Sequence, residues 1–246
     1  MPRFHVDLAL AAGLEAVLPP AAARHVQVLR LQPGDAVTLF DGRGSDWSAE
    51  LLRIGRSEVQ VRVGAAVAID RELPIAVTLA VGMPANERMD WLVEKATELG
   101  AAAVQPLLCE RSVLRLAGER AERRQAHWQS VAAASAEQCG RSRLPLIRPV
   151  QRCADWLLAL PPAAGEARLV LSLVDGALPV CEALRPALQA AARELLLLSG
   201  PEGGLSPAEE AAARTAGLQA VTLGPRVLRA ETAPLAVLGA LTALFA

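Results

Sequence analysis

The sequence contains few aromatic residues, almost no lysine and no spacing typical of a metal site. Among its 246 residues there is no tyrosine, Lys95 is the only lysine, and aromatic side chains make up 3%. We therefore do not expect an extended surface on which several bases stack. The four cysteines, Cys109, Cys139, Cys153 and Cys181, lie far apart without a CxxC pair, and the three histidines show no HExxH spacing. This pattern predicts neither a disulfide framework nor a bound metal.

Long uncharged apolar runs are also missing. No stretch is long enough to span a bilayer, and the first residues do not combine a basic start, an apolar core and a cleavage site. We therefore expect a reduced, soluble, cytoplasmic protein that does not bind membranes.

The charge is nearly balanced overall but uneven along the chain. The formal net charge is −1, which by itself does not indicate a nucleic-acid-binding protein. Residues 111–152, however, carry an excess of six positive charges, from nine arginines against three glutamates. Such a stretch either faces phosphate groups or forms the solvated face of a helix. The nine arginines are Arg111, Arg115, Arg120, Arg123, Arg124, Arg141, Arg143, Arg148 and Arg152.

The pattern of apolar and turn residues differs between two parts of the chain, and we expect domains at residues 1–70 and 71–246. In the first part, short apolar runs alternate with turn residues, as in VTLF (37–40) followed by DGRG (41–44), and EVQVRV (58–63) alternates polar and apolar residues. These patterns predict a small β-rich module or β-barrel. HVQVLRL (25–31) fits either a short helix or a strand.

Beyond residue 74, apolar strands alternate with longer helical patterns. IAVTLAVGM (75–83), ARLVLSL (167–173) and LLLLSG (195–200) have the composition of buried strands, and residues 87–100 and 117–139 have a helical pattern. In the first of these helices one face carries apolar residues and Gly100 suits a C-terminal cap; the face consists of Met89, Leu92, Val93, Ala96 and Leu99. This order predicts an α/β domain with a mostly parallel sheet that is covered on both faces.

A glycine-rich loop joins the LLLLS strand to the next helix. Ser206 is a good helix N-cap, Pro207 suits the first turn, and Glu209 completes a capping box. Residues 200–205 therefore lie at the carboxyl edge of the sheet, where ligands bind in open α/β folds. Gly200 and its neighbours also permit close approach of a ligand to the backbone. The pattern is neither GxGxxG nor GxxxxGK[ST], and a purely structural turn is the alternative.

The segment after the next strand, LGPRVLRAETAPL (223–235), repeats the arrangement of strand, Gly-Pro and helix. It places Arg226, Arg229, Glu231 and Thr232 in an otherwise apolar region. Two adjacent strand ends with such loops form one cleft. The alternative for Arg229 and Glu231 is a local salt bridge or a helix cap.

Together these segments resemble the RsmE family, which belongs to the SPOUT class of RNA methyltransferases. The resemblance rests on GPEGGLSPAEE (200–210) and LGPRVLRAETAPLAVL (223–238), and on MDWLVEKATELGAAAVQPLLCERSV (89–113) and AAASAEQCGRSRLPLI (132–147). At the N-terminus, MPRFHVD (1–7), RHVQVLRLQPGD (24–35) and LFDGRG (39–44) are similar to the family's PUA-like barrel. The similarity covers nearly the whole chain, with the motifs in the same order.

The resemblance implies an N-terminal PUA-like RNA-binding β-barrel and a C-terminal domain with a deep trefoil knot. It implies methylation of N3 of a uridine in 16S rRNA of the small ribosomal subunit, with S-adenosylmethionine as cofactor. It also implies a homodimer, in which a partner subunit covers the apolar last helix, residues 234–246. The cofactor would contact Ser172, Leu173, Leu198, Gly200, Pro201, Glu202, Gly203, Gly204, Leu223, Gly224, Val227, Leu228 and Arg229.

For catalysis we expect Arg229 to orient or stabilise the uracil, and Glu202 or Glu231 to accept the N3 proton. Either carboxylate would alternatively hold Arg229 or a loop in place. The candidate RNA-binding residues are Arg3, Arg24, Arg30 and Arg43 in the N-terminal domain, and Arg111, Arg141 and Arg143 nearer the cleft.

One position departs from the family. The family commonly has a lysine shortly before its first helix, where this chain has Ala85, so Arg88 or another arginine would have to replace it.

Alternative functions are methylation of another rRNA or tRNA position, and a non-catalytic RNA-binding assembly factor. An α/β hydrolase is disfavoured because the chain has no GxSxG motif.

Overall fold

A computed structural model describes residues 1–56, 58–85, 87–163, 165–190 and 192–245. The chain forms two compact units. The N-terminal unit comprises Met1–Glu72 together with Ala133–Leu144, and the C-terminal unit comprises Leu73–Ala132 together with Pro145–Ala246. No helix among the described residues is both long and apolar enough to cross a membrane.

The N-terminal unit is built on a mixed five-stranded sheet with the strand order β1-β3-β4-β5-β2. Strand β1 pairs with β3 in parallel, and the other pairings are antiparallel. The elements are β1 (Arg3–His5), β2 (Glu15–Val17), α1 (Pro20–Val28), β3 (Ala36–Phe40), β4 (Ser45–Ile54) and β5 (Val59–Ala68). The choice left open for residues 25–31 is thereby settled: residues 25–28 are helical, and Ala22, Ala23 and Val26 of α1 pack into the core.

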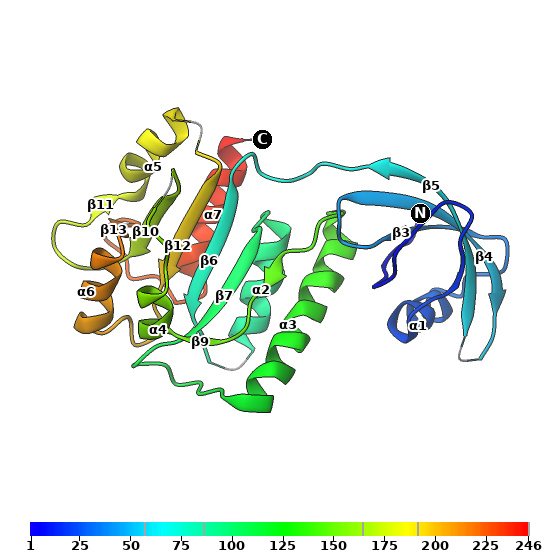
Figure 1. Ribbon diagram of the computed structural model, residues 1–246, viewed down its shortest axis with the longest axis horizontal. Helices are drawn as coiled ribbons and strands as arrows, with labels where there is room; N and C mark the ends of the chain where they lie inside the picture. The colour runs from blue at the N-terminus through cyan, green and yellow to red at the C-terminus, as the bar shows by residue number, and fades with distance from the viewer. Residues whose placement is uncertain (57, 86, 164, 191, 246) are drawn as a thin grey trace. The chain divides into compact units, whose positions relative to one another are not determined.

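The C-terminal unit contains a parallel sheet of eight strands (Figure 1). Its main path runs β11-β13-β10-β12-β6-β7-β8, and β9 pairs with β7. The first elements are β6 (Ala76–Gly82), α2 (Arg88–Glu98), β7 (Ala103–Leu108), α3 (Gly118–Cys139), β8 (Leu146–Ile147), β9 (Gln151–Arg152) and α4 (Cys153–Leu158). The remaining elements are β10 (Ala167–Leu171), β11 (Leu178–Pro179), α5 (Val180–Gln189), β12 (Glu194–Ser199), α6 (Pro207–Thr215), β13 (Gln219–Thr222) and α7 (Thr232–Leu244).

The four leucines of β12 show why this sheet is covered on both faces. Successive side chains of a strand point to opposite faces. Leu195 and Leu197 belong to the core formed with α2, α3 and α7, whereas Leu196 and Leu198 belong to the core formed with α4 and α6. A central strand that is buried on both faces therefore has a continuous apolar run.

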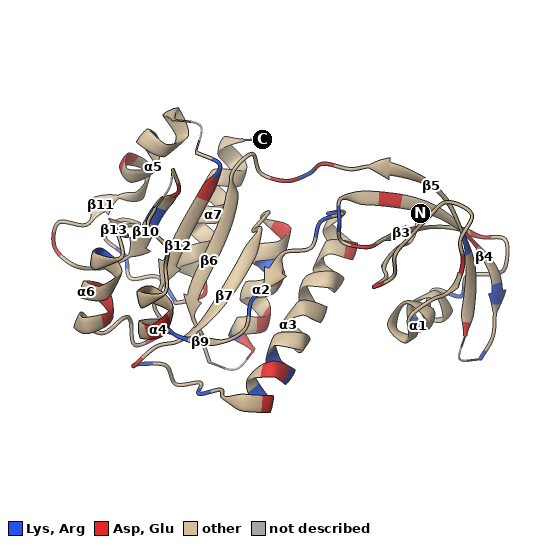
Figure 2. Ribbon diagram, viewed as in Figure 1, with Lys and Arg blue, Asp and Glu red and all other residues tan. Residues whose placement is uncertain are grey.

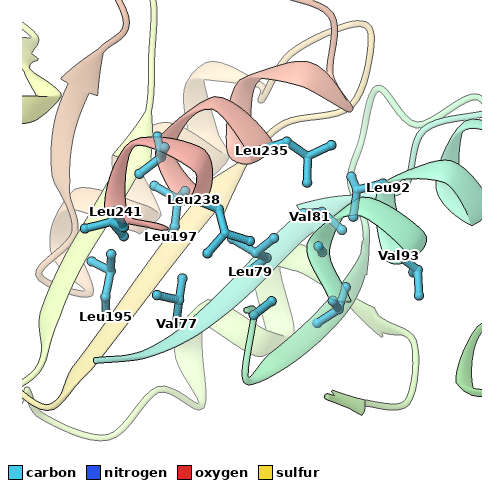
Figure 3. Packing of buried hydrophobic residues seen from close by; sticks show 14 of the residues in the cluster. Val77, Leu79, Val81, Leu92, Val93, Leu195, Leu197, Leu235, Leu238 and Leu241 are labelled. Atoms are coloured by element: carbon cyan, nitrogen blue, oxygen red, sulfur yellow. The ribbon is translucent and has the colours of Figure 1, made fainter. Parts of the chain in front are cut away.

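The larger of these two cores joins the helices α2 and α7 to the central strands. Figure 3 shows side chains from β6, β12, α2 and α7 packed together: Val77, Leu79, Val81, Leu92, Val93, Leu195, Leu197, Leu235, Leu238 and Leu241. Figure 2 shows that β6 and β7 carry no charged residues, as burial of the sheet centre requires. The expected α/β architecture with a parallel sheet is confirmed.

Helix α2 matches the face predicted from its sequence. Met89, Leu92, Val93 and Ala96 are fully buried, and Gly100 follows the helix with φ +91°, a conformation in which glycine is favoured. Trp91 lies on the opposite, exposed side of the helix.

Candidate functional site

The carboxyl ends of three neighbouring strands, β10, β12 and β13, border a cavity of about 500 Å³, here called the main cavity. Each strand continues into one loop of the wall: residues 171–173 after β10, residues 199–205 after β12, and residues 221–230 after β13. Arg88, Arg111, Glu210 and Ala233 complete the lining. The three loops come together because parallel strands present their carboxyl ends at the same edge of the sheet. The expectation that the loops after β12 and β13 follow adjacent strands is wrong, because β10 lies between these two strands.

The glycine loop after β12 is folded tightly against itself. A Cβ atom on Gly200 would lie 2.7 Å from the backbone nitrogen of Leu205, so a larger residue would push the loop apart. Gly204 has φ +70°, in the left-handed region, and its amide donates to the carbonyl of Pro201 at 2.8 Å. The glycines therefore shape the backbone of this wall rather than leaving it loose.

The capping box at the start of α6 holds the other end of this loop. The backbone amide of Glu209 donates to Ser206 Oγ at 3.2 Å, and the amide of Ser206 donates to Glu209 Oε2 at 2.9 Å. The second oxygen of Glu209 accepts the amide of Glu110 at 2.9 Å. One buried carboxylate thus fixes the helix start and ties it to the loop after β7.

Arg111, from the loop after β7, braces the glycine loop from outside. Its Nη1 donates to the carbonyl oxygens of Gly203 and Leu205, both at 3.2 Å. A charged donor on two carbonyls fixes this stretch of backbone. We had expected Arg111 to contact RNA, and the structure places its guanidinium on the loop of the main cavity.

Two serines line the main cavity at the ends of β10 and β12. Ser172 Oγ donates to Glu210 at 3.1 Å and accepts the amide of Val174 at 3.2 Å. Ser199 is buried, and its hydroxyl has no hydrogen-bond partner among the described residues. A buried hydroxyl without a partner is costly, so the Ser199 hydroxyl is available to a ligand in the main cavity. The sequence pattern had pointed to Leu198 instead of Ser199.

Arg226 and Arg229 give the main cavity a positive wall. Both side chains are exposed and, within the described part of the chain, neither guanidinium has a hydrogen-bond or ion-pair partner. The salt bridge or cap considered as an alternative for Arg229 is therefore absent among those residues. Free guanidinium groups at the rim of a cavity are available to a ligand with carbonyl, carboxylate or phosphate oxygens.

The two candidate carboxylates, Glu202 and Glu231, are linked by Arg88. Glu202 Oε1 accepts the amide of Ala85 at 2.9 Å and Nη1 of Arg88 at 3.2 Å. Arg88 Nε lies 3.8 Å from Oε1 of Glu231. Glu231 occupies the N-cap position of α7 without capping it, and its Oε2 is buried with no partner among the described residues. Arg88 thus stands near the position where the family commonly has its lysine, three residues after Ala85.

Most predicted cofactor residues line the main cavity, with two exceptions. Leu198 lies inside β12, where its side chain packs in the core with α4 and α6, and Gly224 is exposed outside the lining. Glu231 lines a smaller neighbouring cavity. The lining residues that the prediction missed are Arg88, Arg111, Leu171, Ser199, Leu205, Glu210, Val221, Thr222, Arg226, Ala230 and Ala233. Leu205 and Arg226 lie in the two loops that the sequence indicated, whereas Arg88, Arg111 and Glu210 reach the cavity only through the three-dimensional packing.

The predicted RNA-binding arginines fall into two groups. Arg24, Arg30, Arg43 and Arg143 are exposed, and a backbone bridge joins residues 43 and 143. Arg3 and Arg141, in contrast, are held within the N-terminal unit. Both guanidinium groups are bonded to protein acceptors.

Arg3 joins the sheet of the N-terminal unit to residues 133–144. Its Nη2 donates to Asp46 at 2.8 Å and to Ser142 Oγ at 3.0 Å, its Nη1 donates to the carbonyl of Ala136 at 3.1 Å, and the guanidinium lies 4.5 Å from the centre of the Phe40 ring. These contacts assign Arg3 a structural role.

Arg141 is buried and forms a two-pronged ion pair with Glu72. The contact between its Nε and Glu72 Oε1 is 3.1 Å. A guanidinium that is only 4% exposed does not reach a phosphate in this arrangement. The expected phosphate contact therefore does not suit Arg141.

Two cysteines that are distant in sequence come together beneath the glycine loop. Cys109, Cys153 and Glu209 are buried, with potential ligand atoms within 4.8 Å of one another. Both oxygens of Glu209 already accept backbone amides. The hydrogen bond between the Cys109 and Cys153 side chains, together with burial, raises the pKa of the Cys109 thiol well above its usual range. The Cys109 thiol therefore stays protonated at neutral pH in this arrangement.

The fold and this cavity define an RNA methyltransferase domain. A family model described as an RNA methyltransferase domain matches residues 71–242, and a second, described as an RNA methyltransferase PUA domain, matches residues 18–64.

Named relatives narrow the class further. The chain is 36% identical over 224 residues to ribosomal RNA small subunit methyltransferase E of Synechocystis sp., covering 89% of this chain and 69% of that protein. It is 32% identical over 230 residues to the Bacillus subtilis protein of the same name, with 88% and 85% covered. A crystal structure of the Neisseria gonorrhoeae protein bound to S-adenosylmethionine shares 34% identity, with a TM-score of 0.88 over 100% of this chain and 98% of that one. The chain belongs to the ribosomal RNA small subunit methyltransferase E family.

Proposed function

We propose that this protein methylates N3 of a uridine in 16S rRNA of the small ribosomal subunit, with S-adenosylmethionine as the methyl donor. The observation that carries the proposal is the main cavity, where a buried serine hydroxyl and two arginines, all without a partner in the described part of the chain, meet at three strand ends. Membership of the family and the bound S-adenosylmethionine of the Neisseria relative support it. The ribosomal substrate would place the enzyme in the cytoplasm.

The residues of the main cavity suit an adenosine-containing ligand. The tightly folded backbone at Gly200–Gly204 offers amides and carbonyls to a base edge and a ribose, and Ser199 offers a hydroxyl. When bound, S-adenosylmethionine supplies a methyl group activated by its sulfonium. Leu173 and Val227 are exposed at the rim, where they would cover apolar parts of the ligand.

The protein's own part in the reaction is to position the uracil and to handle one proton. The N3 atom carries a proton that must leave as the bond to the methyl carbon forms. We assign Arg229 to one carbonyl oxygen of the uracil, where charge develops. Glu231 is the better proton acceptor, because its Oε2 has no partner among the described residues, whereas Glu202 binds Ala85 and Arg88. Glu202 then acts by holding Arg88.

For the RNA, we propose phosphate contacts from the exposed arginines of the N-terminal unit, Arg24, Arg30, Arg43 and Arg143.

We also propose a domain boundary near residue 70, a trefoil knot in the C-terminal domain, and a homodimer. In support of a dimer, α7 exposes Leu244 beside small residues such as Ala240 and Ala243. Sedimentation of the purified protein would test the dimer.

The central test measures transfer of radiolabelled methyl groups to three substrates offered separately. These are naked 16S rRNA, small ribosomal subunits from cells that lack the endogenous enzyme, and bulk tRNA, each digested afterwards to identify the modified nucleoside. N3-methyluridine from the subunits would support the proposal. Label only in tRNA or in another nucleoside would overturn the substrate. No label anywhere, with no binding of S-adenosylmethionine by calorimetry, would favour a non-catalytic RNA-binding protein.

A further inference from the structure

A second cavity, of about 280 Å³, shares the lining residue Arg88 with the main cavity. It is lined by Glu87, Arg88, Trp91, Glu231 and Thr232, from the start of α2 and the start of α7. Arg88 lines both cavities. A group bound in the second cavity would therefore lie next to a methyl donor bound in the main cavity.

Trp91 forms part of the wall of this second cavity. An aromatic side chain there is notable because the chain has only four tryptophans and three phenylalanines. The indole is 44% exposed, whereas Trp128 and Trp156 are buried at 1% and 8% exposure. The neighbouring residues Leu92 and Val93 fill the core, so α2 does not need an aromatic side chain on its outer side. An exposed indole in the wall of this cavity offers a flat surface on which one base can stack.

Glu231 provides a buried hydrogen-bond acceptor in the wall of the same cavity. The residue is 7% exposed, and Oε2 has no partner among the described residues. The nearest cation is Arg88, whose Nε lies 3.8 Å from Oε1. A buried carboxylate oxygen without a partner is costly unless a ligand donates a hydrogen bond to it.

The hydrogen-bonding edge of uracil matches this pair. It presents the N3–H donor between two carbonyl oxygens, so it needs one acceptor flanked by a donor. Glu231 is the acceptor and Arg88 is the donor. Cytosine presents an unprotonated N3 acceptor at the same place, which would face the carboxylate and leave both acceptors unsatisfied.

We propose that the second cavity binds the target uracil after it has left the RNA stack, with the ring on Trp91, N3–H donated to Glu231 and a carbonyl oxygen accepting from Arg88. This inference rests on the proposed function and assigns its base-binding subsite. The N3 proton first passes to Glu231, which leaves an in-plane electron pair on N3. That pair then forms the N3–CH₃ bond as the S–CH₃ bond breaks, and Glu231 later releases the proton to water. Trp91 and Arg88 thereby join the residues that select uridine.

The first test separates binding from chemistry at Trp91. Methylation of small subunits is measured at saturating S-adenosylmethionine for the wild type, Trp91→Ala and Trp91→Phe. Loss of the stacking surface should raise KM for the subunits by about tenfold. The value of kcat and the affinity for S-adenosylmethionine should stay within about threefold. The phenylalanine variant should recover most of the loss, because it keeps a flat ring.

The control is Leu158→Ala, which removes a more exposed apolar side chain, at 84% exposure, from α4. It should leave KM unchanged. A KM for Trp91→Ala equal to that of the wild type, or equal losses in the alanine and phenylalanine variants, would overturn the stacking role.

The second test changes the acceptor with almost no change of shape. Glu231→Gln should lower kcat at least 100-fold while S-adenosylmethionine still binds with about the wild-type affinity. Unchanged kcat would overturn the assignment of Glu231. If the wild type itself forms no N3-methyluridine, the proposed function fails; if the wild type is active and these variants match it, only the base-binding subsite fails.

Discussion

In the N-terminal unit, the guanidinium groups of Arg3 and Arg141 are bonded to protein acceptors, whereas in the C-terminal unit Arg226 and Arg229 border the main cavity without a partner among the described residues. The first pair lies between residues 1–72 and the segment 133–144. A charge that the protein itself neutralises contributes to the fold, and one that it leaves free at a cavity is available to a ligand. Substitution of a paired arginine should therefore lower the stability of the protein, whereas substitution of an arginine at the main cavity should lower methyl transfer.

The largest expected effect on stability is at the buried pair of Arg141 and Glu72. Arg141→Ala would leave the Glu72 carboxylate, whose side chain is 20% exposed, without its cation. We expect the free energy of unfolding to fall by about 3 kcal/mol, measured by urea denaturation. The matched control, Arg143→Ala, changes an exposed arginine two residues away and should stay within about 0.5 kcal/mol. Equal losses would remove the distinction between the two kinds of arginine.

A substitution in the glycine loop of the main cavity should lower the free energy of unfolding somewhat less than Arg141→Ala does. Gly200→Ala would place a methyl group 2.7 Å from the Leu205 nitrogen, so the loop must shift. We expect a loss of about 2 kcal/mol in unfolding free energy and at least tenfold weaker binding of S-adenosylmethionine by calorimetry. Gly239→Ala, in α7 with no atom within 4 Å of the new Cβ, should instead stabilise by about 0.5–1 kcal/mol. A wild-type cofactor affinity in Gly200→Ala would contradict the role of this loop.

Loss of the capping box at the end of this loop should lower the free energy of unfolding about half as much as Gly200→Ala does. Ser206→Ala removes the acceptor for the Glu209 amide at the buried start of α6, and we expect about 1 kcal/mol of destabilisation. Ser130→Ala is the control, because this exposed serine lies within α3 and caps nothing. Thermal unfolding of both variants provides the comparison, and a control as unstable as Ser206→Ala would refute the capping effect.

The smallest effect is a pH dependence in the N-terminal unit. Burial lowers the pKa of His5 from 6.5, although Glu137, Asp7 and Asp41 oppose the shift. The unfolded chain therefore binds the His5 proton more readily, so this residue lowers stability as the pH falls below about 6.5. His5→Gln should flatten that part of the pH–stability curve. Curves of identical slope for the two proteins would show that His5 does not contribute.

Local sequence signals predicted several parts of this structure. The capping residues Ser206 and Glu209 marked the start of α6, and the apolar spacing in residues 89–96 gave the buried face of α2. The glycine loop was correctly placed at the carboxyl end of a buried strand, because the composition of such a loop depends on its own backbone geometry.

Other features depend on contacts between distant residues and left no local pattern. The segment 133–144 joins the N-terminal unit through Arg3 and Glu72, neither of which has a distinctive sequence neighbourhood. Ser199 and Trp91 appeared as ordinary strand and helix residues until folding placed them in cavities. The paired state of an arginine is likewise decided by its three-dimensional neighbours.

The most direct test of this account compares methyl transfer by Arg229→Ala and Arg141→Ala at a temperature at which both remain folded. With small subunits lacking the modification and saturating S-adenosylmethionine, Arg229→Ala should lose at least about 100-fold in kcat while its unfolding free energy matches the wild type. Arg141→Ala should be less stable yet transfer methyl groups at nearly the wild-type rate. A full rate in Arg229→Ala would contradict the assignment of the main cavity's free arginines to the reaction.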